Sequence, residues 1–174
     1  MTYTEAFVTQ NNLQPADAIV LRKKFAGMFD HFAVYLGRHS ETNKPLFAAN
    51  YTNGVQIVKH HELDQFLQVL EPNRIERFNG NHTERRGAVK RAISKIGEKG
   101  YNLIWNNCQH YASFVQYGKK YSPQVDAVGK TMMVGGAATA LIGLASENKK
   151  AAGWGLFFFA LGALASTAAN RDND

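Results

Sequence analysis

The chain has 174 residues and a single cysteine, Cys108. One cysteine excludes an intramolecular disulfide and any metal cluster that needs several cysteine ligands. The sequence also lacks a glycine-rich phosphate-binding loop of the GxxxxGK[ST] or GxGxxG type. No basic start followed by an apolar run is visible at the N-terminus, so we expect no secretory signal. The lone thiol is then either a buried structural group or a reactive one, and it fits a reducing compartment or a periplasmic protein that keeps the thiol protected.

The charge is concentrated in the front part of the chain. Residues 1–126 carry 16 basic and 11 acidic side chains, a net charge of +5, whereas residues 127–174 carry four and three, a net charge of +1. A basic surface can attract nucleic acid or anionic lipid, but a solvated helix face explains the arginines between Arg74 and Arg91 equally well. We do not expect nucleic acid as a partner. The histidines have no metal-ligand spacing, so we expect no metal and no cofactor.

The composition changes near Ala127. Residues 127–174 contain seven of the fifteen glycines and twelve alanines, and they hold two apolar runs, Thr131–Ala145 and Ala151–Ala169. The nineteen residues of the second run rise about 28 Å as a helix, close to the hydrocarbon thickness of a bilayer, whereas the first run is shorter. Small residues would let two helices approach closely. The sequence therefore predicts a front domain over residues 1–126 and a C-terminal hydrophobic helical hairpin over residues 127–174.

Three interpretations of this hairpin remain open from composition alone. It could lie in or on a membrane, it could be an interfacial or oligomer-forming hairpin, or it could pack as a soluble core hairpin on the front domain. The membrane interpretation explains the two long uncharged runs best. We therefore expect residues 127–169 to contact a membrane.

The sequence of the front domain predicts an α+β fold. Apolar runs separated by turn signals predict strands over Ala18–Leu21, His31–Leu36, Leu46–Tyr51 and Val55–Val58, the first of them after a Gln14–Asp17 turn. Asn53-Gly54 is a strong hairpin signal, so the last three strands should form an antiparallel meander. Helical patterns cover Glu62–Val69, Thr83–Lys99 and Cys108–Tyr117. In the second helix we expect Thr83 as the cap, Arg85 and Arg86 exposed, and a buried stripe of Ala88, Ala92, Ile93 and Ile96.

Cys108 opens the third predicted helix, directly after two asparagines that can cap it. The positive end of the helix dipole and the unpaired backbone N–H groups there favour the thiolate, which is the nucleophilic form of cysteine. His110 follows two residues later, about 200° around the helix, so it cannot readily act as a base for that thiol. We interpret His110 as structural.

A thiol nucleophile needs an imidazole within hydrogen-bond reach and a third polar group that orients the ring. His31 opens an apolar strand and shares a face with Ala33 and Tyr35, so it is either a site residue or a core histidine. Asn50 lies on the following strand, where its carbonyl could fix the imidazole tautomer. The alternative for Asn50 is a hydrogen bond to its own local backbone.

Two segments carry a resemblance to a known family. Asp30–Gly37 (DHFAVYLG) and Asn107–Phe114 (NCQHYASF) resemble the paired H-box and NC-box of the lecithin retinol acyltransferase-like family, a circularly permuted branch of the NlpC/P60 papain-like superfamily. The Gln14–Asp17 turn and the segment Tyr117–Val125 are also similar. The resemblance covers about residues 13–126.

The resemblance implies a permuted papain-like (NlpC/P60) fold, in which an antiparallel sheet packs against helices and the nucleophile stands at a helix N-terminus. It implies Cys108 as nucleophile and acyl-thioester carrier, and His31 as general base. Family members typically have a second histidine near positions 49–51, where this chain offers Asn50 to orient His31. Glutamine also replaces the more common glutamate after Cys108.

The function that this resemblance implies is a thiol-dependent acyltransferase or phospholipase A-type hydrolase that acts on phospholipid or other acyl-lipid esters. The protein would be membrane-associated, with its catalytic domain on the cytoplasmic side. Two alternatives remain: a non-catalytic membrane-binding or membrane-remodelling protein, which the replacement by Asn50 keeps open, and a papain-like amidase or peptidase.

Overall fold

The computed structural model describes residues 1–21, 31–69, 72–100, 107–119 and 123–169. They form two compact units, Met1–Lys119 and Lys120–Asp174, which are described separately below. The predicted division after residue 126 falls inside helix α5 (Pro123–Ala145) and stays a prediction.

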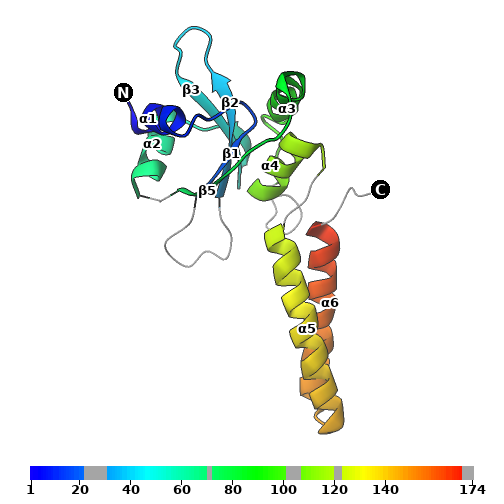
Figure 1. Ribbon diagram of the computed structural model, residues 1–174. Coiled ribbons are helices and arrows are strands. Elements are labelled where there is room, and N and C mark those ends of the chain that lie inside the picture. Colours follow the sequence, from blue (N-terminus) through cyan, green and yellow to red (C-terminus); the bar gives the residue numbers. More distant parts are fainter. Residues whose placement is uncertain (22–30, 70–71, 101–106, 120–122, 170–174) are drawn as a thin grey trace. The chain divides into compact units, whose positions relative to one another are not determined.

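The first unit is built on a five-stranded antiparallel sheet (Figure 1). Its strand order is β4-β3-β2-β1-β5, and consecutive strands β2, β3 and β4 form the predicted meander. The four predicted strands are confirmed, whereas the fifth was not foreseen. The strands are β1 (Ala18–Leu21), β2 (His31–Arg38), β3 (Pro45–Tyr51), β4 (Gly54–Ile57) and β5 (Pro72–Glu76).

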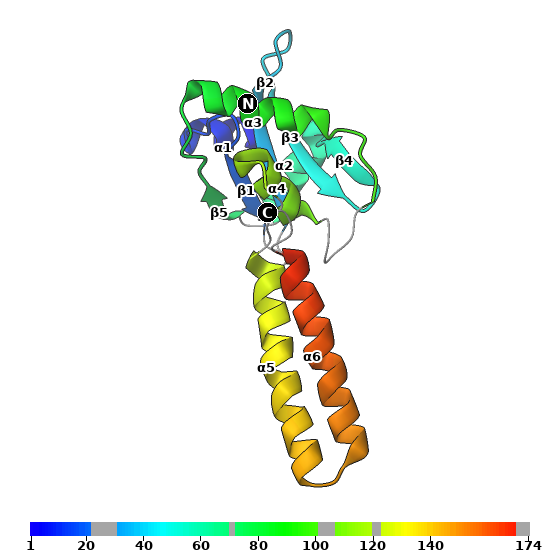
Figure 2. The same cartoon turned by 90° about the vertical axis from the view of Figure 1, so that its right-hand side faces the viewer.

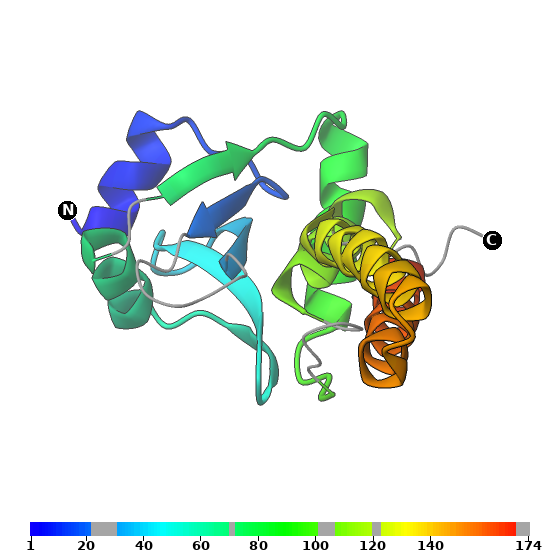
Figure 3. The ribbon, with the colours of Figure 1, turned by 90° about the horizontal axis from the view of Figure 1, so that it is seen from below.

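Helices cover both faces of this sheet (Figures 1 and 3). On one face, α1 (Tyr3–Gln10) and α2 (His60–Val69) pack with Ile19, Ala33 and Phe47. On the other face, α3 (His82–Ser94) and α4 (Cys108–Tyr117) pack with Phe32 and Val34. Because side chains alternate along a strand, odd and even residues of β2 enter different cores. The unit is therefore an α+β sandwich with two hydrophobic cores.

Helix α3 differs from its prediction at both ends. Its N-cap is Asn81 rather than Thr83, because the Asn81 side chain accepts hydrogen bonds from the Thr83 and Glu84 N–H groups. It ends at Ser94, beyond which the Gly97 N–H donates to the carbonyl of Val55 in β4.

The buried stripe of α3 is narrower than the periodicity predicts. Ala88 and Ala92 are fully buried, but Ile93 and Ile96 are 53% and 40% exposed. Arg85, which was expected in solvent, keeps only 15% of its side-chain surface exposed. The two predicted alanines are therefore buried, whereas Arg85 and not the two isoleucines completes the covered face of the helix.

The second unit is an antiparallel helical hairpin of α5 and α6 (Lys149–Ala169), as predicted (Figure 2). Both helices contain 21-residue stretches that are long and apolar enough to cross a membrane, and less than a third of their most apolar windows is buried. Length and composition allow a membrane span without establishing one, because core helices of soluble proteins share them. At one end of the hairpin, the Ser166 hydroxyl donates to Asp126, which also pairs with Lys130.

Candidate functional site

The start of α4 is fixed by a reciprocal cap around Cys108. The Asn107 side-chain oxygen accepts hydrogen bonds from the N–H groups of Gln109 and His110, both at 2.9 Å. In return, Nδ1 of His110 accepts from the Asn107 N–H at 3.4 Å. His110 is fully buried and takes part in this cap, which agrees with the structural role predicted for it. Asn106, the alternative cap, lies outside the described residues.

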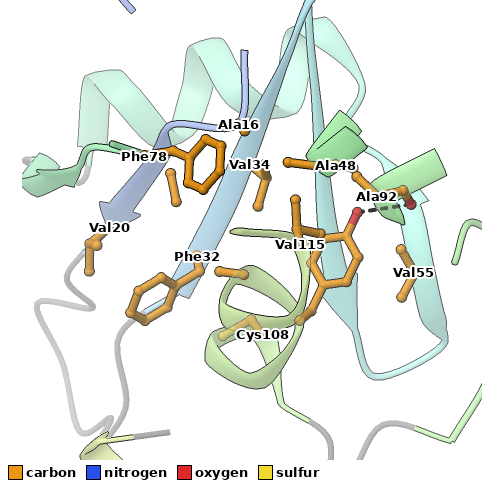
Figure 4. Close-up of a cluster of buried hydrophobic side chains, with 14 residues drawn as sticks. Ala16, Val20, Phe32, Val34, Ala48, Val55, Phe78, Ala92, Cys108 and Val115 are labelled. Carbon is orange, nitrogen blue, oxygen red and sulfur yellow. Dashed lines mark hydrogen bonds between the residues drawn. The ribbon is translucent and has the colours of Figure 1, made fainter. Parts of the chain in front are cut away.

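Cys108 occupies the first turn of this capped helix and is 3% exposed. It belongs to the core that also contains Phe32, Val34 and Val115 (Figure 4). Backbone N–H groups of a first turn have no partner within the helix, and they create a positive potential at the sulfur. The position therefore combines an anion-stabilising helix end with an apolar, water-poor environment.

His31 is the first residue of β2 and is half-buried. It pairs with Leu21 across β1. Strand alternation places it on the side of Ala33 and Tyr35, whereas the next residue, Phe32, enters the core of Cys108. His31 therefore stands at the end of β2, with its side chain on the face of Ala33 and Tyr35.

A cavity of about 260 Å³ opens beside His31. It lies at the end of the sheet beyond Val34 of β2, which pairs with Ala48 of β3. Past this pair, the residues of β2 pair with β1 and those of β3 pair with β4. Three lining residues are polar, and the remaining seven are apolar. The lining consists of Leu21, His31, Phe32, Ala33, Ala49, Asn50, Tyr51, Val58, Leu63 and Phe66.

The polar groups of the cavity come from the ends of two strands. Tyr51 ends β3, and its burial, together with the nearby Glu62 carboxylate, raises the pKa of its phenol to about 12. Tyr51 thus stays a neutral hydrogen-bond donor at ordinary pH. In the described part of the chain, no three His, Cys, Asp or Glu side chains gather into a metal-binding set.

Asn50 connects the cavity with the helix of Cys108. Its side chain is 1% exposed and lines the cavity, and its Nδ2 donates to the carbonyl of Asn107 at 3.4 Å. The bond joins β3 to the residue that immediately precedes Cys108. The predicted roles of Cys108, His31 and Asn50 in catalysis stay predictions.

Sequence reasoning missed the ionic cluster that holds the opening turn. The Asp17 carboxylate is 1% exposed and pairs with Arg77 at 2.9 Å and Arg85 at 3.0 Å. Burial alone would raise the pKa of Asp17, but the N–H groups of Gln14 and Phe78 and the two guanidinium groups outweigh it and lower the pKa. Sixty-eight residues separate Asp17 from Arg85, so no local signal could have paired them.

Two further side chains fix the far end of α4. The Arg91 guanidinium donates to the carbonyls of Val115 and Gln116, where the negative end of the helix dipole favours a cation. The Gln116 amide donates to the carbonyl of Ala16 at 2.9 Å and of Glu76 at 3.2 Å. The helix that carries Cys108 is therefore anchored at both ends.

A family model described as lecithin retinol acyltransferase matches residues 11–121. The chain belongs to this family. The matched segment contains His31, Asn50 and Cys108, and the resemblance seen in the sequence is confirmed.

Two named relatives show how far the similarity extends. Lecithin retinol acyltransferase of Mus musculus is 35% identical over 64 residues, which are 33% of this chain and 28% of that protein. Phospholipase A and acyltransferase 1 of Homo sapiens is 28% identical over 130 residues, which are 68% of this chain and 76% of that protein. The chain thus spans between a fifth and little more than a quarter of the lecithin retinol acyltransferases that it matches.

Proposed function

We propose that the protein is a thiol-dependent acyltransferase or phospholipase A-type hydrolase that acts on acyl-lipid esters through a Cys108 acyl-enzyme. Family membership and the names of the relatives support lipid acyl chemistry. The observation that carries the proposal is the position of Cys108 in the first turn of a doubly anchored helix, one residue from the Asn107 carbonyl that binds cavity-lining Asn50.

In the proposed reaction, His31 takes the proton of the Cys108 thiol, and the thiolate attacks the carbonyl carbon of a lipid ester. Backbone N–H groups at the start of α4, that of Cys108 among them, stabilise the oxyanion of the tetrahedral intermediate. The intermediate expels the alcohol, which takes the proton from the imidazolium, and a thioester remains on Cys108. Water or an acceptor amine or hydroxyl then gives its proton to His31 and attacks the thioester, which releases the acyl group and restores the thiol.

The finer features of the proposal follow from the resemblance. The first unit would have the permuted papain-like (NlpC/P60) arrangement, with a domain over residues 1–126 and a hairpin over residues 127–174. Asn50 would take the place of the usual histidine and orient His31. Residues 127–169 would attach the protein to a membrane, with the catalytic domain on the cytoplasmic side, so that the site stays close to its lipid substrates.

The test uses the full chain and phosphatidylcholine with a labelled acyl group. Wild type should form a labelled thioester that hydroxylamine cleaves, and Cys108→Ala should form none. His31→Ala should lower the rate by about a thousandfold or more, as expected for removal of a general base. His61 is exposed on α2 and serves as the matched control, because His61→Ala should leave the rate unchanged. A wild type without thioester and without fatty-acid release contradicts the proposal.

A second candidate, a non-catalytic membrane-binding protein, is favoured by one observation. The Asn50 amide is bonded to the Asn107 carbonyl, which is a structural use of the residue expected to orient His31. The variant Asn50→His separates the two candidates. If wild type is inert and Asn50→His forms the thioester, the fold retains the site and Asn50 has silenced it.

A further inference from the structure

The proposed mechanism uses the polar edge of the cavity and leaves its apolar part without a role. His31 opens β2 and Tyr51 ends β3, so these groups lie at one end of the sheet. Ala33 and Ala49 lie two residues further along each strand, and α2 supplies Leu63 and Phe66. The cavity therefore has polar groups at the strand ends and apolar walls between the sheet and α2.

The size and lining of the cavity favour an aliphatic ligand. An apolar protein cavity of about 150 Å³ accepts benzene, so by proportion a volume of about 260 Å³ encloses roughly ten carbon atoms. Each methylene group that moves from water into such a cavity adds to the hydrophobic stabilisation of the bound chain. A sugar or peptide of this size would leave many polar groups unpaired against the leucine, valine and phenylalanine walls. A saturated hydrocarbon chain would not.

Two residues of the cavity lining, Asn50 and Phe32, also contact the surroundings of Cys108. Asn50 lines the cavity and donates to the Asn107 carbonyl, one residue before the thiol. Phe32 lines the cavity as well and packs in the same core as Cys108. A ligand whose chain lies against Ala49 and Leu63 would therefore bring its carboxyl end toward His31 and the start of α4.

We propose that this cavity is the acyl-chain subsite of the protein, which takes roughly the first ten carbons of a saturated chain. Ala33 and Ala49 form its floor on the sheet, and Leu63 and Phe66 of α2 form its cover. The two alanines keep the floor open, so their size sets the chain length. This inference rests on the proposed function for the meaning of the chain, but its tests measure binding.

Photolabelling tests occupancy without turnover. Full-length Cys108→Ala, reconstituted in phosphatidylcholine nanodiscs, is irradiated with a decanoic acid that carries a diazirine at its chain end, and the adducts are mapped by mass spectrometry. We expect adducts at Ala33, at Ala49 and at Leu63–Phe66, which excess decanoic acid should reduce at least tenfold. Adducts confined to residues 123–169, or adducts that decanoic acid does not reduce, would overturn the proposal.

Chain-length competition tests the walls. Saturated fatty acids of graded length compete with the photoprobe in wild type and three variants, and a thermal unfolding transition confirms that each variant is folded. Ala49→Leu adds about three carbons to the floor and should shorten the best competitor by about that number, whereas Leu63→Ala should lengthen it similarly. Leu67 packs in the same core without lining the cavity, so Leu67→Ala is the matched control and should change nothing.

The outcomes separate this proposal from the function. If Ala49→Leu does not fold, Leu63→Ala and Leu67→Ala still decide the question. If the best-competing fatty acid has the same chain length in Leu63→Ala as in Leu67→Ala, the subsite proposal is overturned. Labelling of the cavity without thioester formation by wild type contradicts the proposed function and leaves the subsite standing. Thioester formation without labelling of the cavity supports the proposed function and overturns the subsite.

Discussion

Helix α4 and the hairpin of α5 with α6 are held in opposite ways. Seven of the ten residues of α4 are buried, and polar groups fix both of its ends: the Asn107 cap at the start, and Arg91 with Gln116 near the finish. In the hairpin, glycines form the contact. Gly136 and Gly155 stand so close to the partner backbone that an added Cβ would lie 2.6 Å from an atom of the facing helix.

The large side chains are distributed accordingly. In the first unit, Phe32 and Phe47 are 1% exposed. In the hairpin, Trp154, Phe157 and Leu141 are 60%, 50% and 67% exposed. Small residues inside and large apolar residues outside are the arrangement that suits helices in lipid, where backbone approach rather than side-chain burial holds them together. Large apolar side chains are thus buried in the first unit and exposed in the hairpin, where small residues form the contact between the helices.

The largest effect should come from Gly136→Leu. The new side chain would collide with the backbone of Gly155 and Phe159, so the helices must separate at a cost of about 3 kcal/mol or more. The neighbouring Gly135 faces open space, and Gly135→Leu is the matched control that should leave the hairpin intact. Spin labels on cysteines at Leu141 and Leu156, in a Cys108→Ser background, would report the distance between the helices. An unchanged distance in Gly136→Leu would refute the glycine contact.

Asp17→Asn should destabilise the first unit by about 3 kcal/mol. Removing one partner of a buried ion pair leaves uncompensated charge; we expect the lower end of the usual range because Arg77 stays 45% exposed. The control is Glu76→Gln, which removes an exposed pair with Arg74 and should cost less than about 1 kcal/mol. Urea unfolding monitored by far-UV circular dichroism measures the loss of stability in both variants. Equal effects would show that the cluster around Asp17 is no stronger than a surface pair.

The lowered pKa of Asp17 adds a pH dependence to this comparison. Its contribution is fully present above the ordinary carboxyl pKa of about 3.9 and is lost as pH falls through the lower pKa of the folded state. Stability of wild type should therefore fall between about pH 4 and the acid limit, and Asp17→Asn should flatten that slope. Urea titrations at graded pH values test the sign. A slope as steep in Asp17→Asn as in wild type would assign the acid loss to other carboxylates.

The sequence predicts those elements whose signals are local. The strands β1 to β4 follow from apolar runs and the Asn53-Gly54 turn, and α4 follows from its cap and from Gly118, which ends it in the left-handed conformation. Helix α1 was missed although Thr2 and Glu5 form a capping-box pattern that could have revealed it. Strand β5 has no such signal, because an edge strand with exposed Arg74 needs little apolar sequence.

The candidate site could be predicted only in part, for the same reason. Cys108 and His31 stand in recognisable sequence motifs, so both could be named as candidates from the sequence. The cavity lies beyond the pair of Val34 in β2 with Ala48 in β3, and its walls come from several strands and from α2, so local sequence does not reveal it. The bond from Asn50 to Asn107 spans 57 residues. Contacts between residues so far apart in the sequence produce no periodic pattern from which they could be predicted.

Asn107→Ala should cost about 2 kcal/mol, because the buried cap satisfies two backbone N–H groups of α4. The matched control is Asn81→Ala at the start of α3, where the cap is exposed and water can replace it, so the loss should be about 1 kcal/mol or less. Chemical unfolding gives both values, and labelling of Cys108 by a thiol reagent should accelerate only in Asn107→Ala. Equal losses at the two caps would contradict the special anchoring of α4.

The smallest effect should come from Ile93→Gln, at the position where the predicted stripe of α3 was wrong. Ile93 is 53% exposed, and substitutions at exposed sites usually change stability by less than about 0.5 kcal/mol. In the same helix, Ala88 is fully buried, so Ala88→Gln would force a polar side chain into the core and should cost several times more. Urea unfolding of the two variants decides between the narrow stripe of alanines and the wider one. A loss above about 2 kcal/mol for Ile93→Gln would mean that this face of α3 is covered, because an exposed isoleucine has no packing to lose.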